Sequence, residues 1–178
     1  LYGLADFGAL KKVMKNADII TCSDKRSMVN LQKYFGDKCV SLSIGIDFGF
    51  WRPCTEKERI RRALDLDAGK KVLFASSRLI SLKQVDKVID VLNRMCDEFD
   101  FVFVVSGHGE REYENHLVRA GERLLRAGKL RFTGYLTDEK LADYYGVSDL
   151  FIASSLSEAG PTATIKALAM EIPVFTTD

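Results

Sequence analysis

The chain has 178 residues, enough for one full domain or for one domain with a piece of a second. Its apolar content of 47% and charged content of 29% are typical of a soluble globular protein. The net charge of +1 at pH 7 argues against strong electrostatic attraction to nucleic acid or to a membrane surface. We therefore expect no nucleic-acid partner.

The cysteines indicate neither a metal site nor a disulfide framework. They form no Cys-x-x-Cys pair, and no histidine lies close to them in the sequence. Reduced, structural cysteines favour the cytoplasm, and no apolar run reaches the ~18 residues of a membrane span. The four cysteines are Cys22, Cys39, Cys54 and Cys96.

Both ends of the sequence have the character of cut ends. The chain starts at Leu1 without Met and stops at Asp178, just after an apolar segment. We expect a fragment of a longer protein, for which absent targeting signals prove little. Peripheral association with a membrane surface through a missing part stays open beside the cytoplasm.

Apolar spacing predicts two helices and two strands before residue 48. In chain order they are a helix over 5–15, a strand over 17–22, a helix capped by Ser23 or Asp24 that runs to Phe35 with Gly36 as its stop, and a strand over 39–42. Residues 48–54 have no clear period and predict a packed linker. We expect residues 1–48 to be the C-terminal part of a first Rossmann-like domain. Residues 49–65 would form a linker with a charged helix, and 66–178 a second, truncated Rossmann-like domain.

From residue 55 onward, predicted helices and strands alternate. The helices are 55–64, with Thr55 and Glu58 as a capping box, 83–96, 110–127, 138–145 and one with Pro161 in its first turn. The strands are 71–76, 101–105, 130–132, 150–153 and one that begins at 174. Short, uniformly apolar strands between helices predict an α/β fold with a doubly wound, Rossmann-like parallel sheet. Ligands of such sheets bind beyond the carboxyl ends of the strands, so those turns are the candidate sites.

The last complete turn, residues 154–161, consists of small residues and one acid, Glu158. Its backbone N–H groups, at the start of the following helix, would form an anion site. A carboxylate is a poor phosphate ligand, but it suits sugar hydroxyls that lie beside a phosphate. Alone, Glu158 would also fit as a cap acid that the helix dipole favours, so the other turns must show whether a nucleotide-sugar binds here.

Three further turns carry candidate residues. Arg78 and Lys83 follow the strand 71–76 and together suit a diphosphate, although both fit equally well as surface side chains at helix termini. Gly107 begins a Gly-His-Gly turn that permits close approach of backbone to a ligand, in which the histidine is a turn residue rather than a base. Tyr135 and Leu136 follow a strand end where a base could lie, and a core tyrosine is the alternative.

Taken in order, these motifs resemble the retaining glycosyltransferases of family 4 (glycosyltransferase group 1), which have the GT-B fold. Each matching segment corresponds to a motif of that family. The segments are Ala17 to Ser23 (last strand of the N-terminal domain), Ser43 to Pro53 (hinge), Ser77-Arg78-Leu79 with Lys83 (Gly-Arg-Leu…Lys-Gly), and Ser154 to Thr162 (Pro-Ser…Glu-Gly-x-Pro-Thr).

The resemblance implies a hexosyltransferase (EC 2.4) that binds a nucleotide-diphosphate sugar, needs no cofactor or metal, and serves polysaccharide or glycolipid biosynthesis. Residues 1–48 would then belong to the acceptor-side domain, and 66–178 would be the domain that binds the nucleotide-sugar. Arg78 and Lys83 would hold the diphosphate and stabilise the leaving group, and Glu158 would hold hydroxyls of the transferred sugar. The implied binding residues are Gly107, Tyr135, Leu136, Gly160, Pro161, Thr162 and Lys166.

The sequence departs from the family pattern at three positions. The second acid of the Glu-x7-Glu motif, which binds the ribose in the family, falls on Lys166. A lysine cannot accept from ribose hydroxyls, and the lost acceptor would weaken nucleotide binding by about 1–3 kcal/mol. Gln84 replaces the glycine after the family's lysine, and Glu171 replaces a small residue before Pro-Val.

Two other functions stay open beside the transferase. One is a non-catalytic nucleotide-sugar-binding or interaction module, which Lys166 would mark as a degenerate relative. The other is a GT-B sugar-nucleotide epimerase. The acceptor, whether sugar, lipid or protein, would bind mainly to the N-terminal domain, so we expect this fragment alone to be inactive.

Overall fold

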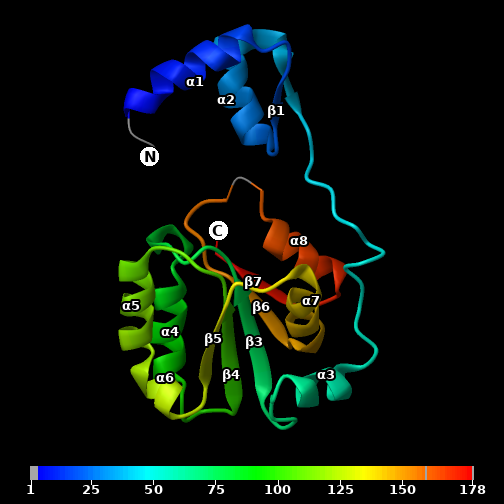
Figure 1. The fold of residues 1–178 in the computed structure, drawn as a ribbon, viewed down its shortest axis with the longest axis vertical. Coiled ribbons are helices and arrows are strands. Elements are labelled where there is room, and N and C mark those ends of the chain that lie inside the picture. The colour runs from blue at the N-terminus through cyan, green and yellow to red at the C-terminus, as the bar shows by residue number, and fades with distance from the viewer. Residues whose placement is uncertain (1–3, 159, 178) are drawn as a thin grey trace. The chain divides into compact units, whose positions relative to one another are not determined.

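The computed structural model describes residues 4–158 and 160–177, and its contacts divide the chain into two compact units, 1–45 and 46–178 (Figure 1). The smaller unit pairs two short parallel strands, with Ile20 opposite Cys39. Its elements are α1 (Leu4–Asn16), β1 (Ile20–Cys22), α2 (Lys25–Phe35), the 3-10 turn η1 (Gly36–Lys38) and β2 (Cys39–Ser41).

The predicted ends of α2 are confirmed. The Asp24 carboxylate caps the helix by accepting from the Ser27 backbone N–H at 2.7 Å, which satisfies one of the free donors of the first turn. Gly36 ends it with φ 64°, a left-handed conformation that glycine adopts without strain.

The larger unit contains a five-stranded parallel sheet in the order β5-β4-β3-β6-β7. Its strands are β3 (Lys71–Ser76), β4 (Phe101–Ser106), β5 (Leu130–Gly134), β6 (Leu150–Ala153) and β7 (Val174–Thr176). Its helices are α3 (Lys57–Ala63), the 3-10 turn η2 (Ser81–Lys83), α4 (Val85–Arg94), α5 (Arg111–Ala120), α6 (Glu122–Arg126), α7 (Asp138–Val147) and α8 (Thr162–Ala169).

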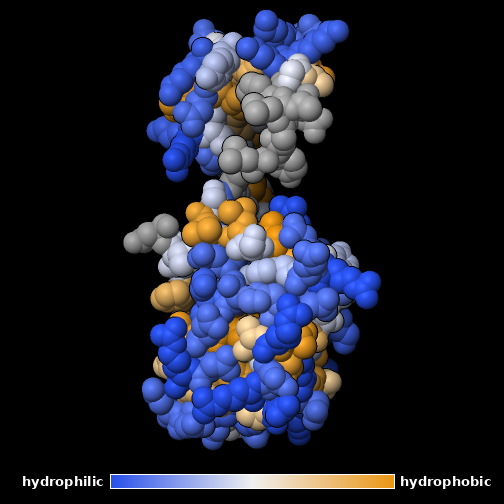
Figure 2. All heavy atoms as spheres, turned by 90° about the vertical axis from the view of Figure 1, so that its left-hand side faces the viewer, coloured by the Kyte–Doolittle hydropathy of each residue, from blue (hydrophilic) through white to orange (hydrophobic). Residues whose placement is uncertain are grey.

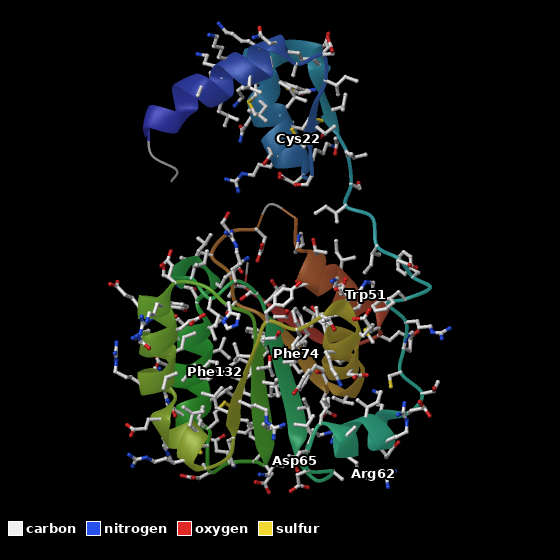
Figure 3. All side chains as sticks on the ribbon, viewed as in Figure 1. Cys22, Trp51, Arg62, Asp65, Phe74 and Phe132 are labelled. Atoms are coloured by element: carbon white, nitrogen blue, oxygen red, sulfur yellow. The ribbon has the colours of Figure 1, made fainter. Side chains whose placement is uncertain are left out.

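Helices cover both faces of this sheet, as Figure 1 shows, with α4, α5 and α6 on one side and α3, α7 and α8 on the other. Successive residues of β4 therefore enter different cores, Phe103 the first and Val104 the second, and both are fully buried. Phe74 packs in the second core against Tyr145, with ring centroids 5.0 Å apart (Figure 3). The side of the molecule that faces the viewer in Figure 2, which is the left-hand side of Figure 1, has a mostly hydrophilic surface. The predicted doubly wound α/β class is confirmed.

The linker residues from 46 onward pack on the larger unit. Trp51 is 5% exposed and belongs to the second core, where its ring makes an edge contact with Tyr145 at 5.8 Å between centroids. Ile60 and Leu64, on and just after α3, pack against the same core. Trp51 is the buried aromatic side chain of this linker, whereas Phe48 and Phe50 are exposed, so one anchoring residue rather than a periodic face holds the segment.

Three predicted helix boundaries were wrong. The capping box at Thr55 does not form, because α3 begins after Glu56, which makes no side-chain cap bond. The predicted helix 110–127 is two helices, α5 and α6, interrupted at Gly121, where a side chain would meet Leu130 at 2.3 Å. Pro161 lies one position before α8, at its N-cap, rather than in its first turn. The N–H at that position makes no hydrogen bond within the helix, so its absence in proline costs nothing.

Left-handed backbone accounts for another difference from the predicted helices, and it also occurs at two of the positions that depart from the family pattern. The predicted helix 83–96 begins only at Val85, because Gln84 has φ 49° and separates η2 from α4. Glu171 has φ 58° and follows α8 closely. Both side chains occupy a conformation that favours glycine.

Candidate functional site

A cavity of about 210 Å³ opens at the carboxyl ends of β3 and β6. These strands are neighbours, but the helices that follow them, α4 and α8, cover opposite faces of the sheet. Such a switch point is the usual ligand site of doubly wound sheets. Six of the predicted site residues line the cavity: Arg78, Lys83, Glu158, Gly160, Pro161 and Thr162. Ala159, within the same turn, lies outside the described residues.

The cavity contains an ion pair between Lys83 and Glu158. Lys83 Nζ lies 2.6 Å from Glu158 Oε1, and the lysine side chain is only 14% exposed. Ser155 Oγ donates to the same oxygen at 2.5 Å. Partial burial would raise the pKa of Glu158, but the hydrogen bonds from Lys83 and Ser155 lower it, and the net shift is downward. Glu158 is therefore an anion at neutral pH.

Arg78 adds a second cation to the same cavity. Among residues 4–158 and 160–177 no ion pair is recorded for its guanidinium, although its charge helps to lower the pKa of Glu158. A cation without a protein partner at the mouth of a cavity is available to an anionic ligand. Together with Lys83, it gives the site two positive charges against one carboxylate.

Backbone contacts hold the two cavity turns against each other. Ser154 Oγ donates to the carbonyl oxygen of Lys83 at 2.7 Å, and the Leu156 N–H donates to that of Leu82 at 2.9 Å. The Ser77 N–H donates to the Ser106 carbonyl at 3.1 Å. The turns that carry Arg78, Lys83 and Glu158 are thus fixed by hydrogen bonds that involve none of the three charged groups.

Gly107 does not line this cavity. It has φ 133°, and a side chain there would lie 1.9 Å from the Ser77 carbonyl oxygen, so the close approach of the two turns requires glycine. Gly107 lines instead a second cavity of about 140 Å³ with His108 and Gly134. His108 Nδ1 lies 3.3 Å from Glu114 Oε1 there.

Tyr135 and Leu136 also lie outside the first cavity, at the carboxyl end of β5. Leu136 packs against the second core, which fixes this turn. The Tyr135 side chain does not pack in the core, since the residue is 78% exposed. An exposed ring beside a fixed turn is free to stack on a planar ligand.

Lys166 is one turn into α8, and its side chain is turned away from solvent. Its Nζ lies 3.0 Å from Asp138 Oδ1 and 3.9 Å from the centroid of the Trp51 ring, and the side chain is 18% exposed. Figure 3 shows Trp51 beside α8. Neither Asp138 nor Ser155 was predicted from the sequence as a site residue, because an acid in a first helical turn and a serine in a turn are common.

A metal-binding cluster and a membrane-spanning helix are both absent from the described part of the chain. No group of three or more His, Cys, Asp or Glu residues is placed there to hold a metal ion. No helix there is long and apolar enough to cross a membrane.

A family model described as "Glycosyl transferases group 1" matches residues 56–178. Among curated proteins, the chain is 27% identical over 178 residues to TuaC of Bacillus subtilis, a glycosyltransferase assigned to teichuronic acid biosynthesis, covering 99% of the chain and 43% of TuaC. It is 28% identical over 138 residues to LpsB of Rhizobium meliloti, a lipopolysaccharide core biosynthesis mannosyltransferase, covering 75% of the chain and 39% of LpsB. The chain thus spans less than half of the length of these relatives.

Solved structures share the fold at low identity. The structure of Anabaena HepE in complex with UDP and glucose superposes with a TM-score of 0.84 at 17% identity, covering 97% of this chain and 48% of HepE. WaaG, a glycosyltransferase of lipopolysaccharide biosynthesis, gives a TM-score of 0.76 at 16% identity, covering 88% of this chain and 43% of WaaG. The predicted GT-B type of fold is confirmed.

Proposed function

The chain belongs to the group 1 glycosyl transferases, and we propose that its protein transfers a sugar from a nucleotide-diphosphate sugar to an acceptor. We propose further that it is a family 4 hexosyltransferase, that it retains the anomeric configuration, and that it works in the cytoplasm without a metal or cofactor. The observation that carries the proposal is the meeting of Arg78, Lys83 and Glu158 in one cavity at the switch point of the sheet.

Arg78 and Lys83 would bind the diphosphate. The guanidinium offers a planar fork and the ammonium a point charge, which suit the two phosphates of a nucleoside diphosphate. Backbone at Gly160, Pro161 and Thr162, just before and at the start of α8, would contact the same group. As the bond to the sugar breaks, negative charge grows on the diphosphate, and these preorganised groups would stabilise it.

Glu158 would accept hydrogen bonds from hydroxyls of the transferred sugar. In the structure its Oε1 is engaged by Lys83 at 2.6 Å and by Ser155. A bound diphosphate would compete with Glu158 for Lys83, which would release the carboxylate toward the sugar. The lowered pKa of Glu158 supports this role, since an acceptor must be ionised to receive several hydroxyl donors.

The nucleotide would extend from this cavity toward Tyr135 and Leu136, with the base against the exposed Tyr135 ring. Gly107 would act indirectly, by letting its turn pack on the Arg78 turn. UDP and UDP-glucose are the ligands named for HepE, and mannose is the sugar named for LpsB, which supports a hexose donor here.

Titration calorimetry of the full chain with UDP, GDP and their glucose and mannose conjugates tests the proposal. We expect one of the two nucleotides to bind the chain with a dissociation constant in the micromolar range. We expect turnover of its sugar conjugate, with release of the nucleoside diphosphate, only when the chain is joined to an acceptor-side domain such as its longer relatives have. No binding at millimolar ligand would contradict the proposal. Binding without turnover of any conjugate by that joined chain would favour the non-catalytic module, for which the replacement of an acid by Lys166 is the supporting observation.

A further inference from the structure

We propose that Asp138, held in place by Lys166, is the carboxylate that accepts hydrogen bonds from the ribose hydroxyls of the donor nucleotide. The proposal rests on the proposed function, because it assumes a diphosphate in the first cavity and a base beside Tyr135. It assigns a ligand-binding role to Asp138, which carries no obvious functional motif in the sequence, and a positioning role to Lys166.

The position of the pair between the two ends of the nucleotide supports this assignment. Asp138 begins α7, three residues after Tyr135 at the base edge. Lys166 lies on α8, four residues after Thr162 in the lining of the diphosphate cavity. Both helices cover the same face of the sheet, and the 3.0 Å contact from Lys166 Nζ to Asp138 Oδ1 joins them. A ribose that links base and diphosphate therefore passes close to this contact.

Lys166 itself is poorly placed to bind the ribose. Its side chain is 18% exposed, and its ammonium lies between the Trp51 ring at 3.9 Å and the Asp138 carboxylate at 3.0 Å. The aromatic face and the carboxylate both attract the cation, so the lysine is fixed at this position. It also has no acceptor atom for a hydroxyl donor.

Asp138 is better suited to the ligand. The capping atom of α7 is Thr137 Oγ1, which accepts from the Lys140 N–H at 3.5 Å, so helix capping does not consume the Asp138 carboxylate. The side chain is 65% exposed, and its ion pair uses Oδ1. No partner is recorded for Oδ2 among the residues that the structure describes. A carboxylate oxygen that faces solvent beside the proposed nucleotide path is an acceptor for ribose O–H donors.

The experiment compares ribose with dideoxyribose. Calorimetry of the full chain would use UDP and 2′,3′-dideoxyuridine diphosphate, the corresponding guanosine pair, and pyrophosphate alone. We expect the native chain to prefer the ribonucleotide by about tenfold, the effect of losing hydrogen bonds to a charged acceptor. Asp138→Asn should reduce this preference to about twofold while leaving the affinity for pyrophosphate unchanged.

A control variant separates ligand binding from a structural effect. Asp143→Asn removes another acid of α7, which lies 3.8 Å from Lys140, and should keep the native preference. An unchanged ratio in Asp138→Asn, or an equal loss of pyrophosphate affinity, would overturn the assignment alone. Failure of the native chain to bind any nucleotide would overturn the proposed function as well.

Discussion

Two of the lysine–carboxylate pairs in the larger unit differ in how they arise. Lys83 and Glu158 come from turns that follow neighbouring strands, and they meet at 2.6 Å inside a cavity. Lys166 and Asp138 come from two helices and meet at 3.0 Å outside that cavity. Strand order alone brings the first pair together, whereas the second depends on how α7 and α8 pack.

The two pairs also differ in the charges and aromatic rings that surround them. The first pair has a second cation, Arg78, beside it, so the site keeps a positive charge after Lys83 and Glu158 neutralise each other. The second pair has the Trp51 ring under its lysine and an exposed carboxylate above. The first pair therefore suits an anion, and the second suits a neutral ligand with hydroxyl donors.

Removing both cations of the cavity, Arg78 and Lys83, should have the largest effect. We expect Arg78→Ala with Lys83→Ala to weaken nucleoside diphosphate binding by about 3–6 kcal/mol, or roughly a hundredfold to ten-thousandfold, from two lost charged contacts. Calorimetry with the tighter of UDP and GDP measures it. Lys87→Ala, an α4 cation that does not line the cavity, is the matched control and should bind normally. Retained binding in the double variant would refute the diphosphate assignment.

Glu158→Gln should separate sugar recognition from diphosphate binding. The amide keeps the size of the side chain but loses the charge, so Lys83 is held less tightly and nucleoside diphosphate binding stays the same or improves. Sugar transfer should fall by about tenfold to a hundredfold, the effect of losing a charged acceptor. Steady-state kinetics of the chain joined to an acceptor-side domain, with the sugar conjugate, beside calorimetry with the nucleotide alone, gives both numbers. Equal losses in the two would show that Glu158 acts on the diphosphate instead.

The second pair predicts that restoring the family's acid at residue 166 is harmful by itself. Lys166→Glu would place a carboxylate near Asp138, in a site where the native lysine side chain is only 18% exposed. We expect a loss of about 1–3 kcal/mol in unfolding free energy, from the repulsion and the lost pair. Denaturant unfolding measures it, with Lys166→Met as the control that removes the charge without repulsion. A variant as stable as the native chain would show that the pair contributes nothing to packing.

The contrast between the pairs also explains what the sequence could predict. Arg78, Lys83 and Glu158 were identified because each follows an apolar strand, and the carboxyl ends of parallel strands share one edge of the sheet. The contact between Asp138 and Lys166 was not predicted, because the two residues are 28 positions apart on different helices and no local pattern encodes a contact between side chains of two helices. Gly107 was expected to bring backbone close to a ligand, but the close approach in the structure is to the Ser77 carbonyl oxygen.

Two helix boundaries that depend on local effects were also predicted, whereas features that involve distant residues were not. Asp24 and Gly36 were predicted correctly, since capping and a left-handed stop are local effects. The break at Gly121 was not predicted; a side chain there would meet Leu130, on a strand that comes later in the chain. Trp51 likewise is explained only by the core that it enters.

The smallest expected effect concerns the backbone beside the first pair. Gln84 follows Lys83 directly and holds φ 49°, a conformation that costs a side-chain-bearing residue about 1–2 kcal/mol. Gln84→Gly should remove this strain, and the greater freedom of glycine in the unfolded chain offsets about half of the gain. We expect a net stabilisation of about 0.5–1 kcal/mol in thermal or denaturant unfolding. Gln84→Ala retains Cβ and should give no such gain, so equal stabilisation by both variants would place the cause in the glutamine side chain rather than in the left-handed backbone that positions Lys83.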